Sequence, residues 1–583
     1  MTLREIAAVV GGTLHDVPDP AVTVTGAVEF DSRRINPGDL FLALPGEHVD
    51  GHDYAPAAIA AGAVAVLSAR PLGVPAIVVA PGEKHAGGNG DALAGGSGDA
   101  LAGGGGDALA GGNSDAPAGG RDTLAGASGD ARAVGSENAC AGGSEDASAG
   151  GSGDAVAEDS GDAHAGKGSG DAQAGRAAGT AYALAHDTDG SGAAVLGALA
   201  RLARAVVDRL VGEHGLTVIG VTGSSGKTST KDLLAGVLAP LGAVVAPPGS
   251  FNNEVGHPWT ALRADTDTRF LVLELSARGP GHIRALTEIA PPSIGVVLNV
   301  GTAHLGEFGG RDAIARAKGE LVEALPSAGL AVLNADDDRV AAMADRTRAR
   351  VVTVGLSEGA DLRATDIRLD ETARARFTLH ANGSRVDVRL AVHGEHQVGN
   401  ALSAAAVALE CGADLETVAA ALSDARVASA HRMDVRTRAD GVTVVNDSYN
   451  ANPDSMRAAL KALVTMSRAG DEPRRSWAVL GEMAELGAES VLEHDRIGRL
   501  AVRLDVDRLI VVGTGRPARA MHQGAVMEGS WGEESLLVPD MESAIAVLDA
   551  ELGAGDVVLV KASNSIGLWA VAQHLTQARE AAR

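Results

Sequence analysis

The sequence predicts an α/β protein with three domains and one long low-complexity insert. Two observations carry this prediction. Short runs of aliphatic residues alternate with amphipathic helical stretches along most of the chain, a pattern typical of parallel sheets flanked by helices. A glycine-rich octapeptide array interrupts the alternation at residues 85–192, and the roughly 475 residues outside it suit three domains.

The first predicted domain spans residues 1–84 and is a small α/β unit. The apolar spacing of LREIAAVV predicts a short helix at residues 3–10. Residues 61–69 (AGAVAVLSA) and 75–81 (PAIVVAP) are expected to alternate helix and strand. Strand and turn signals lie between the first helix and residue 61, which together predict a small α/β domain.

The insert at residues 85–192 repeats units such as GDALAGGS and carries 16 acidic against 4 basic residues. Its acidic residues recur with a period of eight, at Asp91, Asp99, Asp107 and Asp115. Such a segment buries too little apolar surface to offset the entropy of ordering it, so we expect it to be disordered and dispensable for activity. A calcium-binding β-roll is the alternative, although those rolls use a nine-residue repeat.

The central domain is predicted at residues 193–427, with a parallel sheet and a phosphate-binding loop of the P-loop ATPase kind. The apolar spacing at residues 193–210 predicts a long helix. Strands are expected in LTVIGVT, FLVLELS, SIGVVLNV and GLAVLNAD, which helical stretches separate. The last domain, residues 428–583, repeats the pattern with VTVVND, SWAVLGEM, DRLIVVG and DVVLVKAS, and is expected to be Rossmann-like.

The stretch VTGSSGKTSTKD, residues 221–232, follows a predicted strand and opens a helix. Glycines in such a loop let backbone amides face a phosphate, the lysine reaches the β and γ phosphates, and the threonine can bind Mg²⁺. The strict GxxxxGK[ST] pattern is not met, because Val221 stands at its first glycine position. A glycine-rich turn without a ligand is the alternative. The candidate nucleotide contacts are Gly223, Ser224, Ser225, Gly226, Lys227, Thr228 and Ser229.

Three further residues are candidates because the predicted topology brings them near this loop. Glu274 ends a predicted strand, where a carboxylate can hold a metal beside the phosphates. His304 follows the next strand, and Lys318 lies on the helix after it. Each has an ordinary interpretation too: a solvated carboxylate, a structural histidine and a solvent-facing lysine.

The charge, the apolar runs and the cysteine count limit the binding partners and the cellular compartment that we expect for this chain. The net charge is −26, and a strongly acidic chain repels the phosphate backbone of nucleic acids. No apolar run approaches the ~20 residues that cross a bilayer, and no secretory signal opens the chain. The two cysteines, Cys140 and Cys411, support neither a disulfide framework nor a zinc site. We expect a cytoplasmic monomer that binds neither nucleic acid nor membrane.

Several motifs together resemble the bacterial Mur ligases. They are TGSSGKTSTKD, FNNEVGHPWT at 251–260, NVGTAHLGEFGG, GEHQVGNAL at 394–402, NDSYNANPDSMRAAL at 446–460 and LGEMAELG at 480–487. The resemblance covers the whole chain apart from the insert. Within the family the chain is most similar to the members that add a D-alanyl-D-alanine dipeptide, because SYNANPDSM differs from the members that add a single amino acid.

The resemblance implies an enzyme with ATP and two Mg²⁺ ions. The implied catalytic residues are Lys227, Glu274, His304 and Lys318, and the implied metal ligands are Thr228, Glu274, His304 and Lys318. In this family the lysine that matches Lys318 is carbamylated, which turns an ammonium group into a carboxylate-like anion.

The resemblance also implies contacts for each substrate. A UDP-sugar is expected on the N-terminal domain at Ser32, Arg33 and Asp39, and the muramoyl group is expected at Asn252 and Asn253. The implied nucleotide contacts outside the loop are Asn334, Arg432 and Asp447. The implied dipeptide contacts are Asn450, Asn452, Lys561 and Ser563. In VKASNSIGLW, Ala562 and Asn564 stand where the family usually has glycine and a basic residue, which weakens the last two assignments.

The implied reaction is the addition of D-alanyl-D-alanine to a UDP-N-acetylmuramoyl-tripeptide. ATP first phosphorylates the tripeptide carboxylate, and the dipeptide amine then displaces phosphate. Three alternatives stay open: a diamino-acid-adding Mur ligase, a folylpolyglutamate synthase, and a catalytically silent phosphate-loop protein that acts as a scaffold. The sequence also leaves open whether the third peptide residue is diaminopimelate or lysine.

Overall fold

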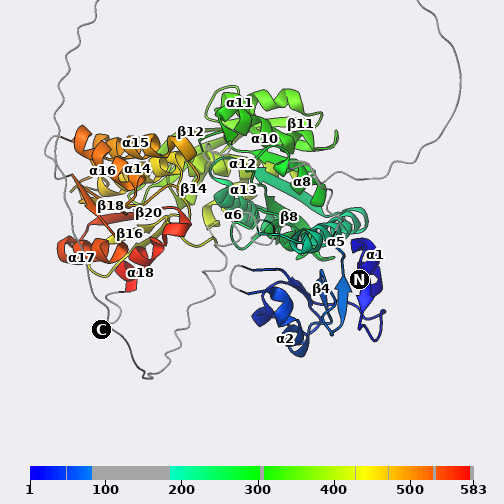
Figure 1. Ribbon diagram of the computed structural model, residues 1–583. Helices are drawn as coiled ribbons and strands as arrows, with labels where there is room; N and C mark the ends of the chain where they lie inside the picture. The colour runs from blue at the N-terminus through cyan, green and yellow to red at the C-terminus, as the bar shows by residue number, and fades with distance from the viewer. Residues whose placement is uncertain are drawn as a thin grey trace, which may run out of the picture. The chain divides into compact units, whose positions relative to one another are not determined.

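The computed structural model describes residues 1–46, 49–81, 184, 186–302, 308–426, 428–470, 472–529 and 534–577. The described residues form three β-sheets with helices packed on them (Figure 1). The predicted fold class, an α/β chain with three sheet-centred domains, is confirmed. Most of the predicted insert, residues 85–192, lies outside the described residues, and so does His304.

The N-terminal sheet has the strand order β1-β5-β4-β3-β2. Its strands are β1 (Thr13–His15), β2 (Val28–Glu29), β3 (Leu40–Leu42), β4 (Ala65–Ser68) and β5 (Ala76–Val78), and its helices are α1 (Leu3–Val10) and α2 (Ala55–Ala60). β1 runs antiparallel to β5, and the other neighbours are parallel. Thr2 and Glu5 cap α1 reciprocally, which explains why this short helix begins where the sequence predicts.

The expected alternation of helix and strand at residues 61–69 and 75–81 is wrong, because both segments contain strands, β4 and β5. The preceding helix ends at Ala60, and Gly62 adopts φ +117°, which few other residues tolerate. All four residues of β4 are buried. A short apolar run that is buried on both faces has no period that separates helix from strand.

The central sheet has the order β14-β13-β12-β11-β10-β9-β6-β8-β7. Its parallel strands are β6 (Thr217–Thr222), β7 (Ala243–Val245), β8 (Thr268–Glu274), β9 (Ile294–Val297), β10 (Leu330–Asn334), β11 (Arg350–Gly355) and β12 (Leu362–Leu369). Two antiparallel strands, β13 (Arg374–Ala381) and β14 (Ser384–His393), extend one edge. The sequence interpretation missed β11 to β14.

Helices cover both faces of the central sheet (Figure 1). They are α5 (Ser191–His214), α6 (Lys227–Leu238), α7 (Gly256–Ala261), α8 (His282–Ile289), α10 (Arg311–Glu323), α11 (Asp338–Ala341), α12 (Gln397–Glu410) and α13 (Leu415–Asp424). Alternate residues of β6 point to opposite cores: Val218 packs with α5 and α7, whereas Ile219 and Val221 pack with α6 and α12. β6 also pairs with both β8 and β9, so the loop at its carboxyl end starts from a rigid position.

The C-terminal sheet has the order β15-β16-β20-β17-β18-β19. Its strands are β15 (Asp434–Thr437), β16 (Thr443–Asn446), β17 (Ser476–Leu480), β18 (Arg508–Val512), β19 (Ser535–Val538) and β20 (Val557–Lys561). Helices α14 (Pro453–Ser467), α15 (Ser490–Arg503) and α16 (Arg516–Glu528) pack on one face, and α17 (Met541–Glu551) and α18 (Trp569–Gln577) pack on the other (Figure 1). Among the described residues, no helix is long and apolar enough to cross a lipid bilayer.

Pro81, before the predicted insert, and Gly190, near its end, lie close together in space. A Cβ atom built on Gly190 would lie 3.4 Å from Cβ of Pro81. The carboxylate of Asp187 accepts hydrogen bonds from the amides of Gly190 at 2.7 Å and Ala193 at 2.8 Å, and Asp189 accepts one from Ser191 at 2.9 Å. These two carboxylates cap the amino end of α5, so the folded central domain begins at about residue 187.

We expect deletion of residues 86–185 to lower the melting temperature by no more than about 4 °C, because it spares both caps of α5 and removes, among the described residues, only the packing of Leu184 against the N-terminal core. Enzymatic activity should stay within a few-fold. Deletion of residues 86–190 is the matched comparison: it removes both caps and should cost about 1 kcal/mol in unfolding free energy. Equal melting temperatures of the two deletion proteins would contradict the role given to Asp187 and Asp189.

Candidate functional site

The predicted phosphate loop connects β6 to α6 at the carboxyl edge of the parallel strands, where α/β sheets bind ligands. Gly226 adopts φ +83°, and a Cβ atom placed there would lie 2.6 Å from Oδ1 of Asn400 on α12. Nζ of Lys227 donates to the Gly223 carbonyl at 2.8 Å, so the lysine folds back over its own loop. The loop is thus preformed, and both the positive φ and the nearby Asn400 side chain favour glycine at residue 226.

Asn299, which follows β9, braces the same loop from the neighbouring strand. Its carbonyl accepts a hydrogen bond from the Ser224 amide at 3.1 Å, and its side-chain oxygen accepts one from the Ser225 amide at 2.9 Å. The Ser224 hydroxyl accepts from the Gly301 amide at 2.9 Å. The sequence interpretation missed Asn299, although its place at the end of a strand beside β6 was a usable signal.

The hydroxyl of Thr228 lies at a junction of three segments. Its oxygen is 2.8 Å from Oγ of Ser250, and Nη2 of Arg432 donates to both hydroxyls at 3.2 Å. The Arg432 guanidinium lies 4.2 Å from the centre of the Tyr449 ring, a cation–π contact that holds it in place. Thr228 and Arg432 were predicted to meet at the nucleotide, whereas Ser250 and Tyr449 were not predicted.

Glu274 is the last residue of β8 and is fully buried. Its Oε2 accepts a hydrogen bond from Nδ2 of Asn252 at 3.2 Å, and its Oε1 has no partner among the described residues. A buried carboxylate oxygen without a donor fits a cation. Oδ1 of Asn253 accepts from the amides of Val255 and Gly256, so this predicted substrate residue also starts α7.

Lys318 projects from α10 and is buried, with 4% of its surface exposed. Within the described residues no acceptor is assigned to its Nζ. Burial, together with the charge of Lys227, lowers the pKa of Lys318 well below its ordinary value. Burial also lowers the pKa of Lys227 itself, which the Arg432 charge lowers further and Glu274 opposes. His304, the other predicted metal ligand, lies outside the described residues.

The donor atoms present fit magnesium. The Thr228 hydroxyl and the Glu274 carboxylate are oxygen donors, as this ion requires, and Mg²⁺ commonly takes one or two carboxylates with phosphate oxygens and water. The described part of the chain holds no group of three His, Cys, Asp or Glu side chains that could form an all-protein metal cage.

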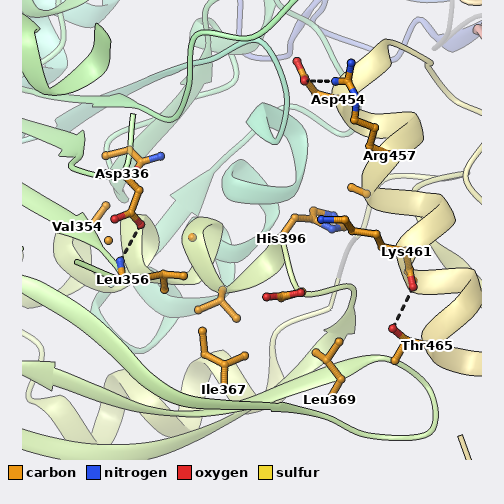
Figure 2. A pocket seen from close by; sticks show the side chains of 17 residues that line it. Asp336, Val354, Leu356, Ile367, Leu369, His396, Asp454, Arg457, Lys461 and Thr465 are labelled. Atoms are coloured by element: carbon orange, nitrogen blue, oxygen red, sulfur yellow. Dashed lines mark hydrogen bonds and ion pairs between the residues drawn. The ribbon is translucent and has the colours of Figure 1, made fainter. Parts of the chain in front are cut away.

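A cavity of about 390 Å³ lies beside the loop, lined by the ends of β10 to β12, the start of α12 and one face of α14 (Figure 2). Val354, Leu356, Ile367 and Leu369 give it an apolar side. Its polar lining residues are Asn334, Asp336, Glu395, His396, Asp454, Arg457, Lys461 and Thr465. An apolar wall with a few polar groups suits a flat heterocycle with hydrogen-bonding edges.

Polar contacts of the cavity lining tie it to the loop. Nδ2 of Asn334 donates to the Leu298 carbonyl at 2.9 Å. Oδ2 of Asp454 accepts from the Thr302 amide at 3.0 Å, and Nδ2 of Asn452 donates to the Ser224 carbonyl at 3.5 Å. Asn452 also caps α14 with Ser455. The predicted residues Asn334 and Asn452 thus lie at one continuous site with the phosphate loop.

Asp447 and Lys561 form a buried ion pair in the C-terminal domain. Nζ of Lys561 lies 2.6 Å from Oδ2 of Asp447 and donates to the Asn450 carbonyl at 2.8 Å. Oδ1 of Asp447 accepts from the Met433 amide, next to Arg432. Lys561 therefore holds the segment from Asp447 to Asn450 in place, and the Ser563 hydroxyl accepts a bond from the Ala484 amide at 2.9 Å.

The predicted UDP-sugar residues lie in and after a short 3₁₀ turn, Ser32–Arg34. Arg33 is exposed and pairs with Asp31 at 2.8 Å. Asp39 is buried, and its carboxylate accepts from the amides of Ala27 and Asn36, both at 2.7 Å. Asp39 thus shapes the turn, while Ser32 and Arg33 remain the more accessible of the three predicted contacts.

Three family descriptions match the chain. Residues 25–85 match the Mur ligase family catalytic domain, residues 221–408 the Mur ligase middle domain, and residues 431–564 the Mur ligase glutamate ligase domain. Each matched range falls on one of the three sheets.

Individual proteins match along most of the chain. It is 53% identical to the UDP-N-acetylmuramoyl-tripeptide--D-alanyl-D-alanine ligase of Mycobacterium tuberculosis (strain ATCC 25618 / H37Rv), over 99% of this chain and 97% of that protein. It is 32% identical to the Escherichia coli (strain K12) ligase of the same name, over 62% of this chain and 77% of that protein. The crystal structure of MurF from Acinetobacter baumannii matches with a TM-score of 0.70 and 25% identity, over 99% of this chain and 98% of that one.

We expect Gly226→Ala to weaken the binding of a non-hydrolysable ATP analogue by about 100-fold, because the new methyl group would meet Asn400 and push the loop out of shape. Gly281→Ala is the matched control: its φ is +85°, and a Cβ atom there meets nothing within 4 Å. Calorimetric titration measures both. A Gly226→Ala protein that binds the analogue as tightly as Gly281→Ala does would show that a Cβ atom at residue 226 does not disturb the phosphate loop.

Proposed function

Because this chain belongs to the Mur ligase family, we propose that it joins D-alanyl-D-alanine to a UDP-N-acetylmuramoyl-tripeptide using ATP. The chain is an ATP-dependent peptide ligase of peptidoglycan synthesis. The observation that carries this function is the 53% identity to the mycobacterial ligase over 99% of the chain, because that length includes all three domains.

The chemistry has two steps. A carboxylate is a poor electrophile, so an oxygen of the tripeptide's terminal carboxylate attacks the γ-phosphorus of ATP, and the bond to the ADP oxygen breaks. The resulting acyl phosphate carries a good leaving group. The free amine of D-alanyl-D-alanine then attacks the acyl carbon, the amine loses a proton, and inorganic phosphate leaves as the amide forms. The product is the UDP-linked pentapeptide.

The residues around the loop stabilise the phosphate charge in this scheme. The Gly223–Gly226 loop and Lys227 would bind the terminal phosphates, and Arg432 would leave its contact with Thr228 to meet them. Thr228, Glu274, His304 and a carbamylated Lys318 would hold two Mg²⁺ ions. When bound, Mg²⁺ neutralises phosphate charge and draws electron density from the phosphorus that is attacked.

The cavity of Figure 2 is the proposed adenosine site. The Nδ2 hydrogen of Asn334 that is not used in its bond to Leu298 would meet the base edge. The Asp336 carboxylate, which already accepts from the Leu356 and Ser357 amides, would accept further bonds from ribose hydroxyls, and the apolar wall would cover the ring face. α14 supplies the other side of the cavity, so the nucleotide contacts both the central and the C-terminal domain. Closure of the C-terminal domain is therefore expected to precede phosphoryl transfer.

We further propose that Ser32, Arg33 and Asp39 form the UDP site, Asn252 and Asn253 the muramoyl site, and the segment around Asn450 and Asn452 the dipeptide site. The enzyme is proposed to act as a monomer in the cytoplasm, where ATP and UDP-linked precursors are available.

Carbamylation of Lys318 is expected to give a carbamate carbon signal in NMR spectra of enzyme in ¹³C-bicarbonate. The unprotonated amine attacks CO₂ and releases a proton, so lowering the pH should weaken the signal. Burial favours the unprotonated amine, because it lowers the lysine pKa. Lys318→Met should lose the signal, and Lys461→Met, at an exposed lysine, should keep it. A signal that survives in Lys318→Met would assign the carbamate elsewhere.

Phosphate release tests the function itself. With ATP, Mg²⁺ and UDP-N-acetylmuramoyl-tripeptide, release should require D-alanyl-D-alanine, and the assay is run with both the diaminopimelate and the lysine tripeptide. Lys227→Ala should lower the rate by at least about 100-fold. Release that depends on a free diamino acid, or on glutamate with a folate, would assign the chain to another ligase of the superfamily. No release with any acceptor would favour a silent scaffold.

A further inference from the structure

Lys231 is a buried lysine for which the reaction scheme has no role. It lies on α6, one turn after Lys227 and Thr228, with 1% of its surface exposed. Its Nζ lies 2.5 Å from Oδ1 of Asp232, donates to the Pro247 carbonyl at 2.7 Å and donates to Oγ of Ser429 at 3.2 Å. Three acceptors therefore take the three ammonium hydrogens.

The acceptors belong to segments that each bring a residue to the phosphate loop. Pro247 lies in the segment that leads to Ser250, whose hydroxyl contacts Thr228. Ser429 lies in the segment that leads to Arg432, whose guanidinium donates to Thr228 and Ser250. Oδ2 of Asp232 accepts from the Ser429 amide at 3.2 Å. The ion pair therefore binds both the backbone and the side chain of Ser429, in the segment 428–433, which we call the linker.

We propose that Lys231 and Asp232 are a positioning pair that fixes the segments carrying Ser250 and Arg432 against the phosphate-loop helix. The pair acts on phosphoryl transfer through Arg432, and this role rests on the proposed function. Because all of its hydrogens are engaged by protein acceptors, Lys231 positions other groups and is not itself a catalytic residue.

Lysine suits this role better than arginine does. An ammonium group is compact and directs three hydrogens outward, whereas a guanidinium is planar and wider. The chain has 49 Lys plus Arg residues, and only seven of them are lysines. Lys231 is one of these few lysines, and it is enclosed between α6, the segment 247–250 and the linker. An arginine at this position would have to displace one of the last two segments.

The proposed role of Lys231 and Asp232 predicts different effects on kcat and on the KM for ATP. The adenosine cavity lies on other elements, so losing the pair should leave the KM for ATP within about three-fold while kcat falls. Small displacements of a group that stabilises a transition state cost rate steeply, by up to about 100-fold. A merely structural lysine would instead lower the amount of folded enzyme and leave kcat per folded molecule unchanged.

Ser429→Ala is the first test, because it removes one contact and keeps the buried ion pair. It should lower kcat about 3- to 10-fold in the unsubstituted enzyme and less than about two-fold when Arg432→Ala is already present. Ser423→Ala is the matched control, since its hydroxyl donates only within α13, to the Ala419 carbonyl, and it should leave kcat unchanged. An equal effect of Ser429→Ala in both backgrounds overturns the proposal.

Hydrogen exchange gives a readout that needs no activity. In nucleotide-free Lys231→Met, the amides of Gly249 and Ser250, which follow Pro247 and Pro248, and those of residues 428–433 should exchange at least about 10-fold faster. The amides of α14 should not change. Unchanged exchange in both segments overturns the proposal. Absence of dipeptide-dependent phosphate release in the unsubstituted enzyme would instead refute the proposed function, and the exchange result would still decide whether the pair positions these segments.

Discussion

The positive charges of Lys227 and Arg432 meet at the phosphate loop, and the buried carboxylate of Glu274 acts against their repulsion. Burial lowers the pKa of both lysines, and a neighbouring positive charge lowers each pKa further, that of Lys227 at Lys318 and that of Arg432 at Lys227. Such a group of cations is stable only if the surrounding fold holds it against its own repulsion. Phosphate groups that bind at this loop would relieve that repulsion.

The rigid support for these charges comes from the sheet. β6 is paired on both edges and packed on both faces, so the loop after Thr222 has little freedom. Glu274 ends β8 and Asn299 follows β9, which are the two strands that flank β6. The three adjacent parallel strands β6, β8 and β9 thus place the phosphate loop, Glu274 and Asn299 at the same edge of the sheet.

Much of this site could be predicted because it is contiguous in the sequence or lies at strand ends. The phosphate loop follows a recognisable strand and Glu274 ends one, whereas Asn334, which also ends a strand, was assigned from the family resemblance. Ser250, Tyr449 and Ser429 could not be found in this way, because their roles arise only when loops far apart in the chain approach each other. The fold, too, could be predicted only in part. The buried parallel strands form clear apolar runs in the sequence. The helix expected at residues 61–69 was wrong, because small apolar residues occur in helices and in strands alike.

The close approach of Pro81 and Gly190 has a consequence for how the chain tolerates change. The cost of an insertion to a folded domain depends mainly on whether the two ends of the inserted segment can meet the chain where it was opened. The entropy lost on closing the inserted loop grows only with the logarithm of the loop length. Doubling the segment would therefore cost only about 0.6 kcal/mol. Changes in the length of this segment, including insertion of a whole domain with close ends, should therefore cost little folding free energy.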